Sequence, residues 1–127
     1  MPALNFKTQF ADDVAFGIKR QTVRAHRKDG RAHAKIGDTI KLYTGMRTKA
    51  CRLLATSTVY RVASVRIEAV EMFINGHRLP MTIHDRDCEQ TDNEFAVADG
   101  FKGFTEMADW FRDTHGLPFE GVVIYWE

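Results

Sequence analysis

The sequence predicts an α+β domain whose centre is a small, partly open mixed β-barrel with two or three helices on its rim. Segments typical of five or six strands and of helices follow one another in mixed order along the chain. Residues 59–69 keep a strand-like period of two over many residues, and Asn75-Gly76 is a strong hairpin signal. The chain of 127 residues is large enough for one hydrophobic core, so a single domain over residues 1–127 is expected.

The first 35 residues predict a strand, a helix and a second strand. A short strand at residues 4–6 precedes a helix at residues 9–16, which ends at Gly17 because glycine adopts a positive φ without strain. The β-branched residues Thr22 and Val23 then favour an extended chain. The helix has a one-sided apolar stripe made of Phe10, Ala11, Val14 and Ala15. Residues 25–35 are polar and predict a loop that could fold over a pocket.

The middle of the chain predicts strands joined by hairpins. Strands at residues 39–43 and 51–58 flank a basic loop at 44–49, and the long segment 59–69 follows. In that segment the small residues Ala63 and Ser64 predict a bend or bulge. Strands at 70–73 and 77–79 then flank the Asn75-Gly76 turn.

The last third predicts two helices and a final strand. A short helix at residues 94–98 precedes Asp99-Gly100-Phe101, and a longer helix ends at Gly116 with Pro118 beyond it. The longer helix has apolar residues at helical spacing, namely Phe104, Met107, Ala108 and Phe111. Residues 119–126 are apolar enough for a central strand. The aromatic residues of these elements, among them Trp110 and Trp126, are expected in the core rather than in a base-stacking surface, for which Tyr43 and Tyr60 are freer candidates.

Charge is distributed very unevenly along the chain. Residues 1–66 contain fourteen Lys and Arg against four Asp, a net charge of +10, whereas residues 67–127 contain four basic and thirteen acidic residues, a net charge of −9. The first part therefore suggests an anionic partner, although the two parts could simply neutralise each other within one domain. The densest basic run, residues 19–31, includes Lys28 and Arg31.

Several classes of protein are disfavoured. No apolar run approaches the roughly 18 residues of a membrane-spanning helix, and the first residues lack the basic and apolar blocks of a signal peptide. A cytoplasmic protein is therefore expected, in which Cys51 and Cys88 are reduced thiols. His84 and Cys88 share a helical spacing, but no second pair completes a zinc site, so neither a metal nor another cofactor is expected.

Residues 17–24 concentrate reactive side chains. Lys19, Thr22 and Arg24 bring an amine, a hydroxyl and a guanidinium into six residues, and Thr22 and Arg24 would share one face of a strand. A hydroxyl can attack an amide when a base removes its proton, and a lysine can be that base once burial or nearby cations such as Arg20 lower its pKa. Each residue also has an ordinary alternative: a structural hydroxyl, a solvated ammonium, or an arginine paired with an acid.

Read as Gly17-x-Lys19-x-x-Thr22-x-Arg24, this segment resembles the signature of the ASCH domain family, small β-barrel proteins related to the PUA RNA-binding fold. The resemblance extends to the strand at 4–6, to Ile36-Gly37-Asp38 before a strand, and to residues 98–101 before the late helix. It implies a PUA-like barrel. Members of the family are RNA-binding modules, ribonucleases, or amidohydrolases that remove acyl groups from the N4 nitrogen of cytidine.

In those amidohydrolases a lysine, a threonine and a later carboxylate, usually glutamate, do the work. The resemblance implies that Lys19 and Thr22 are catalytic and that Asp99, one methylene shorter than glutamate, is the acid. Other candidates for the acid are Glu94, Glu71 and Glu68, and Asp99 could instead cap a nearby helix start. The residues expected to bind substrate are Arg24, Arg20, Arg47 and Tyr43.

The expected function is thus hydrolysis of an N4-acylated cytosine nucleoside. An RNA-binding module remains open, in which residues 19–31 and the loop at 47–49 hold phosphates, and so does a ribonuclease that uses the same cluster. A small pocket closed by residues 25–35 would favour the nucleoside enzyme. An open basic groove would favour RNA.

Overall fold

The computed structural model describes residues 2–80 and 90–127, which form three helices and seven strands. The strands are β1 (Ala3–Phe6), β2 (Gln21–Ala25), β3 (Thr39–Thr44), β4 (Arg52–Ile67), β5 (Met72–Ile74), β6 (His77–Arg78) and β7 (Phe119–Trp126). The helices are α1 (Thr8–Ala15), α2 (Asp92–Ala98) and α3 (Phe104–Thr114). The predicted α+β class is confirmed, but seven strands are described instead of five or six, and the segments predicted at 51–58 and 59–69 form the single strand β4.

The described strands form one mixed sheet organised around the long strand β4. The first half of β4 pairs with β3, and its second half pairs with β7 on one side and β5 on the other. β1 adds to β3 in parallel, whereas β2 adds to β7 in antiparallel orientation. Between the described end strands β1 and β2 there is no strand pairing, so backbone hydrogen bonds do not close this sheet into a barrel.

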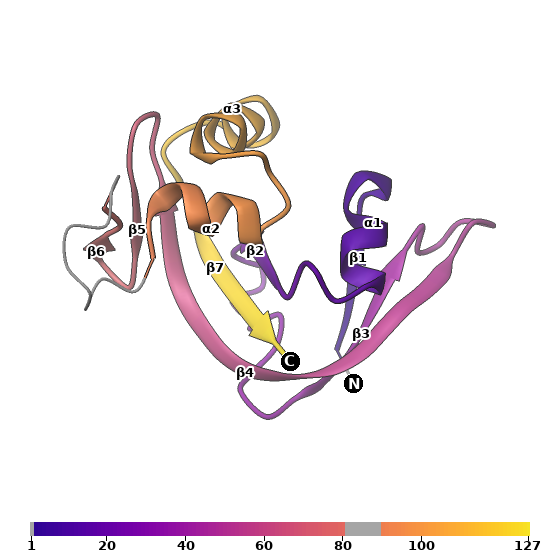
Figure 1. The fold of residues 1–127 in the computed structure, drawn as a ribbon. Helices are drawn as coiled ribbons and strands as arrows, with labels where there is room; N and C mark the ends of the chain where they lie inside the picture. The colour runs from indigo at the N-terminus through magenta and orange to yellow at the C-terminus, as the bar shows by residue number, and fades with distance from the viewer. Residues whose placement is uncertain (1, 81–89) are drawn as a thin grey trace.

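β4 bends strongly and belongs to both parts of the sheet, the part that contains β3 and the part that contains β7 (Figure 1). A register shift between Val59 and Arg61 lies where its pairing passes from β3 to β7. There is no bulge at Ala63 and Ser64, where a bend or bulge was predicted, because these residues pair regularly with Val123 and Val122. A β-bulge increases local twist and bending, and here it lies a few residues earlier than the small side chains suggested.

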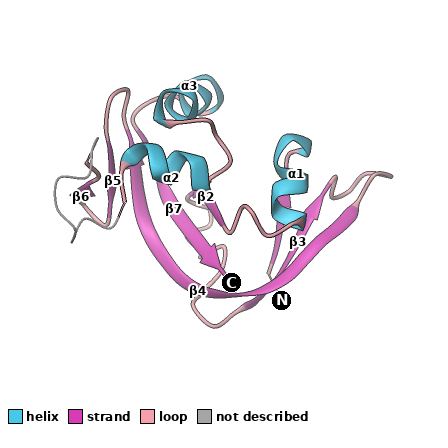
Figure 2. Cartoon of the chain, in the orientation of Figure 1, coloured by secondary structure: helices cyan, strands magenta, loops and turns pink. Residues whose placement is uncertain are grey.

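The three helices lie on the concave side of the bent sheet (Figure 2). α1 buries Phe10, Ala11 and Val14, while Ala15 is exposed. α3 buries the whole predicted stripe of Phe104, Met107, Ala108 and Phe111. These faces join the buried side chains of the sheet in one hydrophobic core. The core holds α1 and α3 on either side of the strand β2, and this places the pocket described below.

Within residues 2–80 and 90–127, no helix combines the length and the apolar character needed to cross a membrane. His84 and Cys88, considered above for a metal site, lie outside the described residues.

Candidate active site

A pocket of about 340 Å³ lies between β1, β2, α1 and α3. Its aromatic lining consists of Phe6, Phe10, Phe101, Trp110 and Phe111. Its polar lining includes Lys19, Thr22, Arg24 and Asp99. The structure therefore brings the three residues predicted to be catalytic, and one of the four predicted to bind substrate, to one cavity of the size typical of small-molecule sites.

The turn after α1 places Lys19. Gly17 has a φ of +74°, and the backbone N–H groups of Ile18 and Lys19 both donate to the carbonyl oxygen of Asp13. These two hydrogen bonds hold residues 18–19 against the end of α1, just before β2 begins at Gln21. The Lys19 side chain consequently points into the protein, where it is only 3% exposed.

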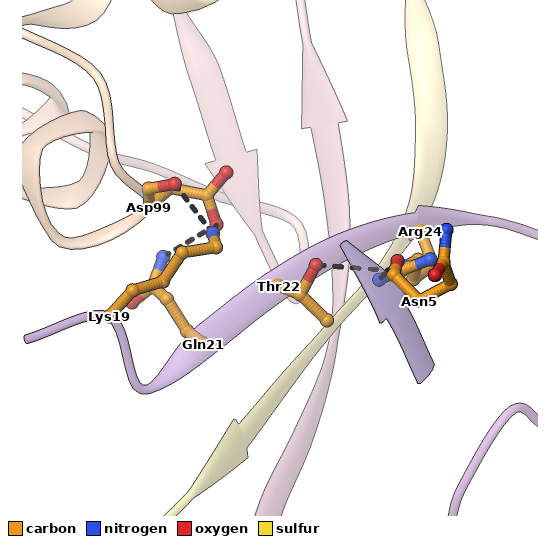
Figure 3. A network of polar contacts seen from close by, with 6 residues as sticks. All are labelled: Asn5, Lys19, Gln21, Thr22, Arg24 and Asp99. Atoms are coloured by element: carbon orange, nitrogen blue, oxygen red, sulfur yellow. Dashed lines mark hydrogen bonds and ion pairs between the residues drawn. The ribbon is translucent and has the colours of Figure 1, made fainter. Parts of the chain in front are cut away.

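Lys19 is paired with Asp99 from the other half of the chain (Figure 3). Its Nζ lies 3.3 Å from Oδ1 of Asp99 and donates to the backbone oxygen of the same residue at 2.5 Å. The ammonium also lies 5.0 Å from the ring centroid of Phe10 and 5.9 Å from that of Phe6. Lys19 thus has a carboxylate on one side and apolar rings on the other.

The end of α2 places Asp99. It is the C-cap residue of that helix, and Gly100 follows with a φ of +103°. Its Oδ1 also accepts a hydrogen bond of 3.4 Å from Nε2 of the buried Gln21. The alternative in which Asp99 caps the start of the next helix does not apply, because the side chain of Asn93 accepts the N–H of Phe104 there.

Burial shifts the pKa values of both members of the pair toward their neutral forms. It lowers the pKa of the Lys19 ammonium, against the opposing effect of Asp99, and the Arg24 charge lowers that pKa further. Burial likewise raises the pKa of the Asp99 carboxyl, against the opposing effects of Lys19 and Gln21. A lysine with a lowered pKa has more of the neutral amine that a base requires.

Thr22 lies further along β2 and contacts Arg24 instead of Lys19 (Figure 3). Its Oγ1 accepts a hydrogen bond of 3.2 Å from Nε of Arg24, while Nη2 of Arg24 donates to the backbone oxygen of Asn5 at 2.6 Å. Among the hydrogen bonds of the described residues, none joins Lys19 and Thr22. Proton transfer between them would need a bridging water or a change of side-chain position.

Three residues predicted to bind substrate lie outside this pocket. Arg20 is exposed and donates to the backbone oxygen of Gly17. Arg47 is exposed in the loop between β3 and β4, and Tyr43 is half-buried in β3, beside Asn5 of β1. Of residues 25–35, which were expected to cover the pocket, Ala25 alone lines it.

The rival carboxylates have other contacts. Glu94 completes the capping box of α2 by accepting the N–H of Thr91. Glu71 pairs with Arg78 at 3.0 Å, and Glu68 pairs with Arg66 at 3.3 Å. Within the described part of the chain, Asp99 is the one carboxylate in the lining of the pocket.

The sequence interpretation missed several groups that line or support the pocket. They are Asn5, Lys7, Gln21, Trp110 and His115. Gln21 could have been noticed as a polar residue next to the motif. Trp110 belongs to a helix whose apolar stripe was assigned to the core, and only tertiary packing shows that it is half-buried at a cavity.

Neither models of protein families, nor curated proteins, nor solved structures gave a match to this chain. The resemblance of residues 17–24 to the ASCH signature therefore stays a prediction, and the chemistry of the site has to be argued from its own contacts.

Proposed function

We propose that the protein is an amide hydrolase of the cytoplasm that removes the acyl group from N4-acylated cytosine nucleosides, with Thr22 as nucleophile, Lys19 as base and Asp99 as its partner. The observation that carries this proposal is the burial of Lys19 at an aromatic pocket that Thr22 also lines, with its pKa lowered by that burial. A buried amine and a hydroxyl in the lining of one pocket are the groups that nucleophilic catalysis requires.

The first half of the proposed reaction transfers the acyl group to Thr22. The neutral amine of Lys19 takes the Oγ1 proton through a bridging water, and Oγ1 forms a bond to the acyl carbon. Arg24, which already donates to Oγ1, supplies positive charge beside the oxygen atoms that become negative. When the intermediate collapses, the carbon–N4 bond breaks, N4 takes the proton from Lys19, and the cytosine nucleoside leaves.

The second half releases the acid. A water molecule attacks the ester on Thr22 and gives a proton to Lys19, which returns it to Oγ1 as the carboxylic acid leaves. Asp99 stays next to Lys19 in both halves. Its carboxylate favours the ammonium form of Lys19 and orients the amine, since Nζ is bound to both Oδ1 and the backbone oxygen of Asp99.

The same proposal covers the barrel. We propose that the bent sheet is the partly open barrel that the ASCH resemblance implies, and that the gap between β1 and β2 is its opening. Arg24 supports this interpretation because it reaches from β2 to the backbone of Asn5 in β1. The catalytic groups would then lie at this opening.

The experiment that tests the proposal is incubation of the purified protein with N4-acetylcytidine, with cytidine and acetate measured by chromatography. Wild-type protein should release both in equal amounts, and Lys19→Met should nearly abolish the release. Lys41→Met is the matched control, because Lys41 is exposed on β3. Absence of cytidine release by the folded wild-type protein would refute the proposal.

A second candidate is an RNA-binding module or a ribonuclease. It is favoured by the exposed basic loop after β2, where Lys28 and Arg31 form no ion pair among the described residues. Changing Arg27, Lys28 and Arg31 together to Ala should then weaken RNA binding. Affinity should also fall with salt, with a slope of roughly −0.7 per neutralised phosphate of a single strand. If RNA is cleaved when it is incubated with the wild-type protein, the ribonuclease is indicated. If the wild-type protein binds no RNA at low salt, both the RNA-binding module and the ribonuclease are excluded.

A further inference from the structure

Trp110 presents an aromatic surface to the pocket that the four phenylalanine rings do not. Phe6, Phe10, Phe101 and Phe111 also line the cavity, but each is at most 8% exposed and is therefore committed to the core. Trp110 is half-buried, and its ring centroid lies within 6.4 Å of those of Phe10, Phe101 and Phe111. It packs edge-on against Phe111, with ring centroids 4.9 Å apart, so the indole is held in a fixed orientation.

The indole is covered by a cation. Nζ of Lys7 lies 4.8 Å from the centroid of the Trp110 ring. Lys7 stands between β1 and α1, across the pocket from α3, and its side chain is exposed. No ion pair of Lys7 occurs among the described residues, so its contact with the indole is an exposed cation–π interaction, which is weak. A ligand could displace such a cation at little cost.

Trp110 lies close to the reactive groups without touching them. Phe10 connects the two, because its ring is 6.4 Å from the Trp110 ring and 5.0 Å from Nζ of Lys19. A flat ring that stacked on the indole would therefore lie on the far side of Phe10 from Lys19, or next to it. Its exocyclic group could then point toward Lys19 and Thr22, which line the same pocket.

We propose that Trp110 is the stacking wall that recognises the planar base of the ligand, and that Lys7 covers this wall when the pocket is empty. The class of ligand is a flat, uncharged heteroaromatic ring such as cytosine, whose π-face suits an indole. The choice of cytosine rests on the proposed function. Trp110 is in this view a specificity-determining residue, and Lys7 competes with the ligand.

Cytidine tests the inference independently of hydrolysis, because it is the product of the proposed reaction and contains no amide bond to cleave. The chain has two tryptophans, and Trp126 is buried in the core at 3% exposure. A base that stacks on Trp110 should therefore quench the emission of this residue and leave that of Trp126 unchanged. The Trp110→Phe variant should lose the quenching, although it keeps an aromatic ring for binding. Calorimetric titration with cytidine supplies the affinities of wild type, Trp110→Phe and Trp110→Leu.

The expected results are specific to stacking. Trp110→Leu should weaken cytidine binding by about tenfold or more, and Trp110→Phe by less. Lys7→Gln should tighten binding about two- to fivefold, since it removes the competing cation, whereas Lys41→Gln should change nothing. Circular dichroism checks that the variants fold. Quenching of the Trp110 emission by cytidine is measured in the wild-type protein, so this result does not depend on the folding of any variant.

Other outcomes separate this inference from the proposed function. If cytidine quenches the emission of Trp110 but the wild-type protein does not hydrolyse N4-acetylcytidine, the stacking wall is supported and the proposed hydrolase activity is refuted. If the wild-type protein hydrolyses N4-acetylcytidine but Trp110→Leu binds cytidine with unchanged affinity, the hydrolase activity is supported and the stacking wall is refuted. Weaker binding in Lys7→Gln, or no binding of cytidine by wild type at millimolar concentration, would overturn the inference.

Discussion

At the scale of single residues, the site depends on a lysine and a carboxylate that are both taken out of water. Lys19 and Asp99 are 3% and 4% exposed, and each lies 80 positions from the other along the chain. Removing an ion from water costs several kcal/mol, so each partner makes the burial of the other tolerable. The carboxylate also limits how far the pKa of Lys19 falls, and that balance determines how much neutral amine is present near neutral pH.

This balance predicts the pH dependence of the proposed reaction. A base must be unprotonated, so kcat/KM should rise with pH through a midpoint below the ordinary lysine value of 10.5. Asp99→Asn removes the carboxylate that raises the pKa of Lys19, so the midpoint should move to lower pH whatever the loss in maximal rate. The measurement is kcat/KM for N4-acetylcytidine from pH 5 to 10 in both proteins. A midpoint that stays in place or moves upward in Asp99→Asn would contradict the assignment of Lys19 as the base.

At the scale of elements, local sequence patterns predicted most of the fold. The stripe of α3 and the Asn75-Gly76 turn depend on neighbours within a few residues, and both are confirmed, with φ values of +51° and +81° at the turn. The bulge at Val59 was not predictable in this way, because its position depends on which strands pair with each half of β4.

The same distinction applies to the site. Lys19, Thr22 and Arg24 could be predicted as a group because they are close in sequence. Asp99 was one of four candidate acids until the fold joined the end of α2 to the turn after α1. The position of Trp110 at the pocket was missed because its helix also has an apolar stripe that packs in the core. Whether a ring on such a helix is fully or only partly buried depends on tertiary contacts that the sequence does not show.

The corner between α2 and α3 provides a test at this scale. Gly100 has a positive φ, and a Cβ there would lie 2.7 Å from Cδ1 of Phe10, so Gly100→Ala adds a clash to backbone strain. Gly116 also has a positive φ, but a Cβ there would meet nothing within 4 Å. Urea unfolding should therefore show that Gly100→Ala loses about 1–3 kcal/mol more than Gly116→Ala. Equal losses would mean that Phe10 is not packed against this corner.

At the scale of the whole molecule, the bent sheet brings two of its end strands, β1 and β2, near each other without pairing them. Arg24 bridges the gap, because one nitrogen of its guanidinium binds Thr22 on β2 and another binds the backbone of Asn5 on β1. The guanidinium also lies 4.9 Å from the ring centroid of Phe6. Arg24 therefore stabilises the arrangement of the strands as well as the position of Thr22, the proposed nucleophile.

Arg24→Lys tests this bridge. A lysine keeps the charge but has a single terminal nitrogen, so it cannot reproduce the fork that contacts both strands. We expect a loss of about 1–3 kcal/mol in the free energy of unfolding, the usual range for hydrogen bonds to charged groups. Arg31→Lys, on the exposed loop, is the matched control and should change the free energy of unfolding little. If the two variants are equally stable, Arg24 does not hold the end strands together.

The most direct test of the central claim is the rate of N4-acetylcytidine hydrolysis in Thr22→Val, Lys19→Met and the double variant. Thr22 and Lys19 act as one unit in the proposed mechanism, so each single change should lower kcat by about a thousandfold or more, and the double change should cost little beyond either. Thr56→Val, on the exposed face of β4, is the matched control and should react like wild type. Wild-type turnover in Thr22→Val, or losses that multiply in the double variant, would contradict a Thr22 nucleophile activated by Lys19.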